Sequence, residues 1–314
     1  MPAALRSAGS RVRVVAAIVC ATMILTPVAP QMASAAAGDP TPLWGWGENF
    51  SGQTGDGHSF YALEPVLALT GVVAASGGDG HSLAVDGDGV AWSWGAGDSG
   101  RLGDETTVER RAPGAIPGLP FAVDVAAGGD HSLVLASNGR GFGFGDNGDG
   151  QTGNGTSGPD VLLPAEGGPT TLPQFKAIAA GSDHSVALDV DGGVWSWGRA
   201  SRGQLGDGQP LLSLAVDQTN PVPLAGSGLP VFTDIAVGPT GSHTVALDAT
   251  GVVWTWGENS SGELGDGTTV ARSTAAPVVW PEPDTTIVGI AAGKGFTLAL
   301  DDAGVVWVWG SNFY

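Results

Sequence analysis

Residues 184–198 read HSVALDVDGGVWSWG, and this stretch decides the fold. Its first half is a short run that alternates apolar with smaller side chains, which is typical of a β-strand. Asp and Gly in the middle favour a tight turn, because Gly adopts a positive φ without a steric cost. The return half, Val-x-Trp-x-Trp, places alternate aromatics on one face of a second strand. The stretch therefore predicts a β-hairpin.

The same hairpin recurs along the chain. Equivalent stretches begin at His81, His131, His184 and His243, and Phe296 begins the last one. In all five copies a Gly lies eight residues later and the second aromatic 13 residues later. Six aromatic pairs are each followed by Gly, and their second members are Trp46, Trp94, Phe144, Trp197, Trp256 and Trp309. The resulting period of about 50 residues indicates a propeller or a solenoid.

The composition limits the class of protein. The 314 residues include 53 Gly and 21 Pro, which excludes a helical bundle because each Gly inside a helix costs about 1 kcal/mol. With 31 acidic and 12 basic residues, the net charge of −19 disfavours binding to nucleic acid.

Residues 1–35 are predicted to be a signal peptide. Arg6, Arg11 and Arg13 precede an apolar run over residues 14–25, and small residues at 33–35 resemble a cleavage site. An uncleaved membrane anchor is the alternative, although the apolar run is short for a bilayer span. Cleavage removes Cys20 and leaves a mature chain that we expect to be secreted or at the cell surface, without a membrane span. A short linker over residues 36–42 then leads into the repeats at 43–314.

The repeats resemble those of the regulator of chromosome condensation family. The resemblance is carried by Trp-x-Trp-Gly, by GQLGDG at residues 203–208 and by AAGSDHS at residues 179–185, and it covers about residues 43–310. It implies an all-β propeller of four-stranded blades, usually seven. This chain holds only five full repeat periods plus a partial terminal unit. Truncation of a longer ancestor, pairing of the first and last aromatic strands, and closure by another chain are all open.

The repetition also argues against enzymatic chemistry. A Ser or Thr follows each of the four repeated histidines, but a catalytic site needs one such pair rather than four. We expect His81, His131, His184 and His243 to be structural, and likewise the core aromatics Trp46, Trp94, Trp197, Trp256 and Trp309. Asp-rich turns such as residues 86–89 and 146–149 could attract calcium, but they lack the ligand spacing of an EF-hand. No catalytic, cofactor-binding or metal-binding residue is predicted.

A binding surface is expected in the connections that vary between repeats, where aromatic and Arg side chains supply most interface energy. The alternative for each residue is packing at a blade edge. The predicted partner-binding residues are His58, Phe60, Tyr61, Glu109, Arg110, Arg111, Leu211, Leu212, Leu214 and Trp280.

The function expected from these observations is that of an exported, non-enzymatic module that binds a protein partner, as an inhibitor or an adhesin does. The family that the repeats resemble includes exported bacterial propellers that inhibit β-lactamases, and the signal peptide fits that branch. The family also includes eukaryotic guanine-nucleotide exchange factors for a small GTPase, and such a regulatory role is the alternative function.

Overall fold

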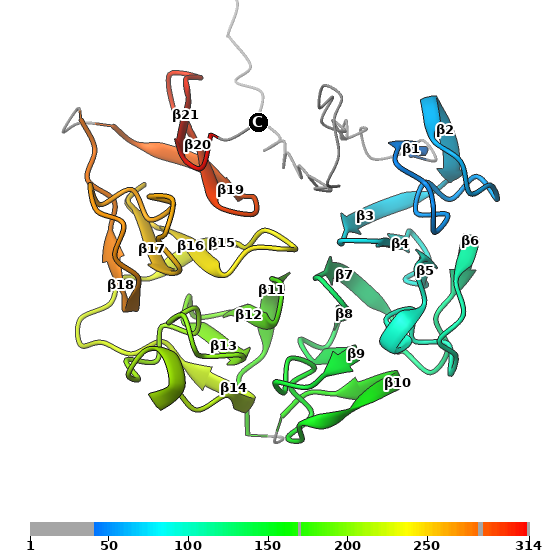
Figure 1. Ribbon diagram of the computed structural model, residues 1–314, viewed down its shortest axis with the longest axis horizontal. Coiled ribbons are helices and arrows are strands. Elements are labelled where there is room, and N and C mark those ends of the chain that lie inside the picture. The colour runs from blue at the N-terminus through cyan, green and yellow to red at the C-terminus, as the bar shows by residue number, and fades with distance from the viewer. Residues whose placement is uncertain (1–40, 169–170, 282–284, 313–314) are drawn as a thin grey trace, which may run out of the picture.

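The computed structural model describes residues 41–168, 171–281 and 285–312, which form an all-β ring of sheets around a central axis (Figure 1). The predicted signal peptide and nearly all of the predicted linker lie outside the described residues. Helical structure among the described residues consists of two short 3₁₀ turns, η1 (Asp98–Gly100) and η2 (Leu212–Leu214).

Four blades contain four antiparallel strands each, and the first strand of each blade lies nearest the axis. The first two blades contain β3 (Val72–Gly77), β4 (His81–Asp86), β5 (Ala91–Gly95) and β6 (Arg110–Ala115), then β7 (Ala122–Ala127), β8 (His131–Ala136), β9 (Gly141–Asn147) and β10 (Gly158–Glu166). The next two contain β11 (Phe175–Ala180), β12 (His184–Asp189), β13 (Val194–Gly198) and β14 (Gln218–Pro223), then β15 (Phe232–Ala236), β16 (His243–Asp248), β17 (Val253–Gly257) and β18 (Arg272–Pro277).

Two smaller sheets flank these blades. A three-stranded sheet contains β19 (Ile287–Ala292), β20 (Phe296–Asp301) and β21 (Val306–Gly310), and a two-stranded sheet contains β1 (Leu43–Gly47) and β2 (Ala62–Leu69). The arrangement confirms the predicted β-propeller with a partial terminal unit. Within the described residues, β1 pairs with β2 and β21 pairs with β20. The first and last aromatic strands therefore do not pair with each other, and the closure that such pairing would give does not occur among the described residues.

The repeated hairpin has the expected register. In the third blade His184 pairs with Gly198 and Leu188 pairs with Val194, so the strands meet without a bulge. The turn holds Gly192 at a φ of +90°. Asp189 closes the turn: its carboxylate accepts the backbone N–H of Gly193 at 2.7 Å and the indole N–H of Trp195 at 2.8 Å. The Asp thus fixes the first aromatic of the pair, as its counterparts do in three other repeats.

The second aromatic of the pair packs against the preceding blade at Trp94, Phe144, Trp197, Trp256 and Trp309. Trp94, Trp197 and Trp256 are buried, whereas Trp46 and Trp309, in the two smaller sheets, are half-buried. The indole N–H of Trp197 donates to the carbonyl of Gln151 in the preceding blade at 2.9 Å, and Trp256 donates to Gln204 at 3.0 Å. Each of these buried indoles contributes apolar area to the core and also joins two blades.

The four repeated histidines link neighbouring blades as well. The Nε2 atom of each lies 2.8 to 3.1 Å from a hydroxyl of the next blade, in the pairs His81–Ser132, His131–Ser185, His184–Thr244 and His243–Thr297. Each hydroxyl donates its single proton to a backbone carbonyl, as Ser185 does to Gln151 at 2.8 Å. The hydroxyl oxygen must therefore accept from Nε2–H, which fixes the histidine tautomer.

Burial keeps these histidines neutral. Loss of solvation lowers the pKa of His131 to about 4, of His184 to about 3 and of His243 to about 4. It also lowers the pKa of His81 well below its usual value, with Arg101 adding to the effect. Side chains that are uncharged, buried and engaged in the same bond four times are suited to holding blades together.

Candidate functional site

The strand order collects the variable loops at one end of the propeller. Because neighbouring strands are antiparallel, the turn between the first and second strands and the loop between the third and fourth strands emerge at the same end. We call this end the loop face. The loops between the third and fourth strands of the four blades are residues 96–109, 148–157, 199–217 and 258–271. The loop 48–61, which joins β1 to β2, lies beside them, because the N–H of Gly57 donates to the carbonyl of Arg111.

A buried Asn holds three of these loops in shape, namely Asn49, Asn147 and Asn259, and its side-chain oxygen accepts a backbone N–H five residues later in each. In the loop 258–271 the side-chain amide of Asn259 donates to Asp266 and to two backbone carbonyls, and its oxygen accepts the N–H of Leu264. Burial alone would raise the pKa of Asp266, but hydrogen bonds from Thr268 and Asn259 and the charge of Arg272 outweigh it and lower the pKa. The loop tips are therefore presented on a preorganised base.

Three predicted partner-binding residues form an exposed cluster on the loop face. Phe60 is 77% exposed and Tyr61 58% exposed, and His58 is exposed beside them. The ring of Tyr61 lies 4.9 Å from that of Phe50, edge to face. We call Phe50, His58, Phe60 and Tyr61 the aromatic patch. Sequence reasoning missed Phe50, which occupies a position of the repeat loop.

Glu109 and Arg111 lie on the neighbouring loop and strand. Arg111 is exposed, forms an ion pair with Glu109, and accepts the N–H of Gly57 through its carbonyl oxygen at 2.9 Å. That bond joins the loop of the aromatic patch to strand β6, so these predicted residues of two repeats lie on one continuous surface.

Arg110 is placed differently. It folds back on strand β5, where it donates to the Ser93 hydroxyl at 2.7 Å and to the Gly114 carbonyl at 3.2 Å. Burial lowers its pKa, although Asp104 opposes the effect. Arg272 makes the equivalent bonds in β18. Both arginines lie 15 residues after the Gly that ends the preceding aromatic strand, so the sequence did carry a signal of a repeated, structural position. A binding role for Arg110 stays a prediction.

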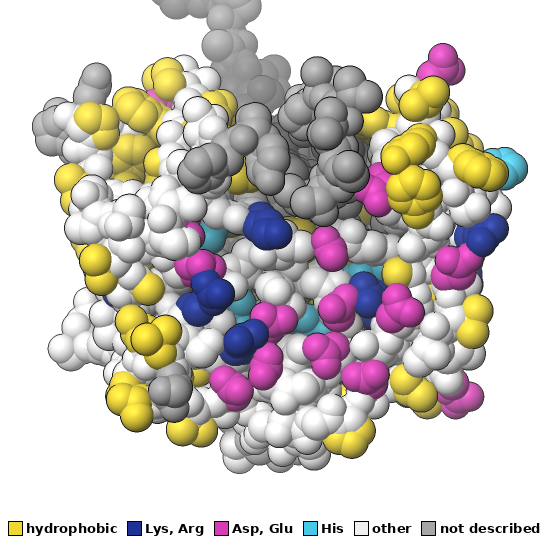
Figure 2. All heavy atoms as spheres, in the orientation of Figure 1, with side chains coloured by type: hydrophobic (Ala, Val, Ile, Leu, Met, Phe, Trp, Pro, Cys, Tyr) yellow, Lys and Arg dark blue, Asp and Glu magenta, His cyan; other side chains and the backbone are white. Residues whose placement is uncertain are grey.

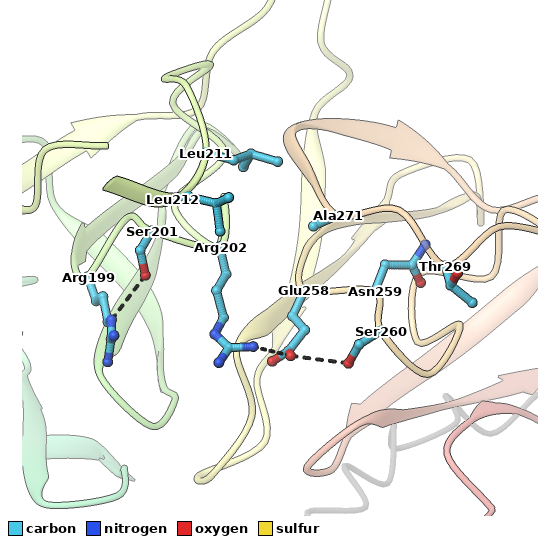
Figure 3. A pocket seen from close by; sticks show the side chains of 10 residues that line it. All are labelled: Arg199, Ser201, Arg202, Leu211, Leu212, Glu258, Asn259, Ser260, Thr269 and Ala271. Carbon is cyan, nitrogen blue, oxygen red and sulfur yellow. Dashed lines mark hydrogen bonds and ion pairs between the residues drawn. The ribbon is translucent and has the colours of Figure 1, made fainter. Parts of the chain in front are cut away.

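The three predicted leucines lie in the loop 199–217. Leu211 is half-buried, whereas Leu212 and Leu214 are 73% and 72% exposed. Leu211 and Leu212 line a cavity of about 530 Å³ that also involves the loop 258–271 of the next blade (Figure 3). Arg199 and Arg202 line the same cavity. Neither arginine was predicted from the sequence, because both occupy positions of the repeat loop.

Trp280 lies in the connection between β18 and β19, which the strand order places at the end opposite the loop face. It is half-buried, and its ring contacts those of Trp307 at 5.7 Å and Trp309 at 5.6 Å, edge to face. The structure therefore does not bring Trp280 together with the other predicted binding residues.

Acidic side chains surround the axis on the loop face, with basic side chains among them (Figure 2). Burial raises the pKa of Asp130, which Arg101 opposes and the charges of Asp146, Asp79 and Asp183 reinforce. Among the described residues, no group of His, Cys, Asp and Glu side chains has the arrangement needed to hold a metal ion. Over the same residues, no helix has the length and apolar character to cross a bilayer.

Comparison with known proteins identifies the repeat. Residues 88–135, 191–247 and 250–300 match the family described as regulator of chromosome condensation (RCC1) repeat, and a second description of that repeat matches residues 122–151, 175–204, 232–263 and 287–314. The ultraviolet-B receptor UVR8 of Arabidopsis thaliana is 30% identical over 85% of this chain. The chain spans 60% of the length of that receptor.

Two solved structures are similar. Human WBSCR16 superposes with a TM-score of 0.74 and 27% identity over 86% of this chain and 71% of that one. Prp20p from Saccharomyces cerevisiae, described with its binding to Gsp1p and histones, superposes with a TM-score of 0.59 and 21% identity over 88% of this chain and 82% of that one. At that identity the similarity to Prp20p concerns the fold. These three similar proteins come from eukaryotes.

Proposed function

Because the chain belongs to the family of proteins built from regulator of chromosome condensation repeats, we propose that it is a non-enzymatic scaffold that binds a protein partner through its loop face. The observation that carries this proposal is the aromatic patch. Phe50, Phe60 and Tyr61 are all more than half exposed and lie on the loop 48–61, which is bonded to the next blade. Exposed aromatic side chains on a fixed base are the typical anchors of protein interfaces.

The repeated histidines support the non-enzymatic part of the proposal. Each of the four is buried, neutral and bonded to the following blade. Because each histidine bonds a Ser or Thr hydroxyl of the following blade, the four share one structural role, and none differs from the others as a catalytic residue would.

Export is the second part of the proposal, and it rests on residues 1–35. The basic start, the apolar run and the small residues at 33–35 are arranged as in a signal peptide. On this basis we propose that the mature chain acts outside the cell or at its surface, as an inhibitor-like or adhesin-like scaffold. Mass spectrometry of the chain recovered from the culture medium tests this. A mature N-terminus at residue 36 is expected, and an intact chain retained in the cytoplasm would contradict export.

A capture experiment tests partner binding. The purified chain is used to capture extracellular proteins, in parallel with the variants Phe60→Ala and Tyr61→Ala. Val190→Ala serves as the control, because Val190 is 52% exposed but lies in a hairpin turn at the opposite end of the blade. Loss of a captured protein with the two aromatic variants and not with the control is expected. Equal capture by all forms would reject the loop-face assignment. A separate assay of nucleotide release from small GTPases tests the exchange-factor alternative, and accelerated release would favour it.

A further inference from the structure

The cavity between the third and fourth blades is a second feature of the loop face. It is bounded by the loop 199–217 on one side and the loop 258–271 on the other (Figure 3). Arg202 reaches across from the first loop to form an ion pair with Glu258 of the second, and the Ser260 hydroxyl also donates to Glu258 at 3.2 Å. Leu211 and Leu212 stand beside the arginines in the same cavity, so it has a charged part and an apolar part.

The arginines of the cavity are unusually accessible for this protein. Seven arginines lie among the described residues, and the side chains of only three of them are more than two-fifths exposed: Arg111 at 46%, Arg199 at 44% and Arg202 at 49%. Two of the three therefore line one cavity, in a chain whose net charge is −19. Glu258 is the one acidic residue in the lining, so the lining residues carry a net charge of +1 and favour an anionic group although the chain as a whole is acidic.

Both arginines of the cavity keep free guanidinium donors. Arg202 uses Nη1 for Glu258, and Arg199 uses Nη1 for Asp183 and Nε for Ser201. Among the described residues, Nε and Nη2 of Arg202 and Nη2 of Arg199 have no hydrogen-bond partner. Glu258 and Asp183 are less exposed than the two arginines, at 24% and 31%, and one oxygen of each already accepts from an arginine. An incoming carboxylate thus finds free donors on guanidinium groups that are the more exposed partners of both ion pairs.

The apolar part is held out toward solvent by the loop itself. Leu212 has a φ of +63°, a conformation that is strained for a side chain of this kind, and its N–H donates to the Ser201 carbonyl at 2.7 Å. The loop is closed by a bond from the Ala200 N–H to Asp217 at 2.9 Å and by two bonds between Gln209 and Val216. A leucine that is fixed and strained, yet 73% exposed, is placed to contact another molecule.

We propose that this cavity binds a partner segment that presents a carboxylate next to a branched aliphatic side chain. The carboxylate takes the free guanidinium donors of Arg202 and Arg199, which suit a forked, two-oxygen acceptor. The aliphatic side chain packs against Leu211 and Leu212 and removes their apolar surface from water. This inference rests on the proposed function, because it assigns the chemistry of one contact on the loop face.

Peptide selection tests the proposed chemistry without knowledge of the natural partner. A library of displayed seven-residue random peptides is selected on the full chain, on the double variant Arg199→Gln/Arg202→Gln and on Lys176→Gln. Lys176 is the control, because it is an exposed cation at the start of β11, at the end opposite the loop face, and lies outside the cavity. We expect peptides with Asp or Glu beside Leu, Ile or Val to be enriched on the full chain and on Lys176→Gln, and not on the double variant.

A selected peptide is then synthesised and titrated by fluorescence anisotropy. Its affinity should fall about tenfold or more with Arg202→Gln, since a hydrogen bond to a charged group is lost. Leu212→Gly should weaken binding several-fold while the melting temperature stays the same or rises, because Gly relieves the positive φ. A merely structural role for Leu212 would not give this combination. Enrichment of basic peptides, no enrichment on any form, or equal affinity for the double variant would overturn the proposal.

The capture experiment described above separates this inference from the proposed function. Capture that is lost with Phe60→Ala but retained by Arg199→Gln/Arg202→Gln would reject the cavity as the contact and leave the loop face as the binding surface. Capture that is retained by both forms would reject the loop face itself.

Discussion

The Nε2 atom of His131 lies 2.8 Å from the Oγ atom of Ser185, although 54 residues separate them in the chain. Ser185 in turn donates to the carbonyl of Gln151, the same oxygen that accepts the indole N–H of Trp197. One buried histidine thus stands at the start of a short chain of bonds that joins the second blade to the third.

Removing this histidine should destabilise the ring. His131→Ala leaves the Ser185 hydroxyl without its donor and opens a cavity, so we expect the free energy of unfolding to fall by about 2–4 kcal/mol. His131→Gln is the control, because it keeps an N–H donor and most of the volume, and should lose less. Chemical denaturation followed by tryptophan fluorescence measures both. A loss below about 0.5 kcal/mol for His131→Ala would contradict a role in joining the blades.

Stability should depend on pH through the same residues. In the folded chain burial lowers the pKa of His131 to about 4 and of His184 to about 3, from an ordinary value of 6.5. Below pH 6.5 the unfolded chain therefore binds more protons than the folded chain. Stability is fully present above pH 6.5 and falls as the pH drops toward 4 and 3, by up to about 1.4 kcal/mol per pH unit for each histidine.

Melting temperatures measured between pH 8 and pH 5 check this prediction. They should be level above about pH 7 and decrease below about pH 6. The decrease should be shallower for His131→Gln, which has one titrating group fewer. A melting temperature that stays constant down to pH 5 would show that the histidines accept protons in the folded chain.

Two glycines of one loop provide a matched pair. Gly265 has a φ of +65°, and a Cβ atom there would lie 2.7 Å from Nε1 of Trp309. Gly267 has a φ of +78° with nothing within 4 Å of an added Cβ. Gly267→Ala should cost about 1–2 kcal/mol from backbone strain alone. Gly265→Ala should cost about 1–3 kcal/mol more, because Trp309 must move. Equal losses in thermal unfolding would show that the indole adapts without a penalty.

Substitution of Trp280 tests whether this residue packs in the core or binds a partner. Its ring contacts Trp307 and Trp309, so Trp280→Ala should lower the free energy of unfolding by about 2 kcal/mol or more. Trp280→Phe keeps a ring in place and should lose less. Partner capture by the folded fraction should be unchanged, because Trp280 lies at the end opposite the loop face. Weaker capture without a change in melting temperature would instead support the anchor role predicted from the sequence.

The blade architecture could be predicted from the sequence because it depends on the spacing of residues that are close together in the chain. The interval of 13 residues from His184 to Trp197 fixes a hairpin whose register follows from strand alternation alone. The bonds between blades could not be predicted in this way. The partner of His184 is Thr244, 60 residues away, and only the closing of one blade on the next brings the two side chains together.

The candidate site was predictable only in part. Three of the residues predicted from variation between repeats, Phe60, Tyr61 and Leu212, are exposed, and their role in binding stays a prediction. This variation gave no measure of exposure for Arg110, which is held by Ser93 and Gly114. It also concealed Arg202, because a residue inside a repeat motif looks structural although its side chain points into a cavity (Figure 3).

In four loops one backbone carbonyl accepts two hydrogen bonds from the next blade, and this arrangement affects how the loop sequences can change. Gln53, Gln151, Gln204 and Glu263 each provide such an oxygen at the base of a loop. Substitutions or insertions at the tip of a loop leave these hydrogen bonds intact, so the tip can change without loss of the contact between blades. Binding specificity can then change one loop at a time while the propeller itself stays the same.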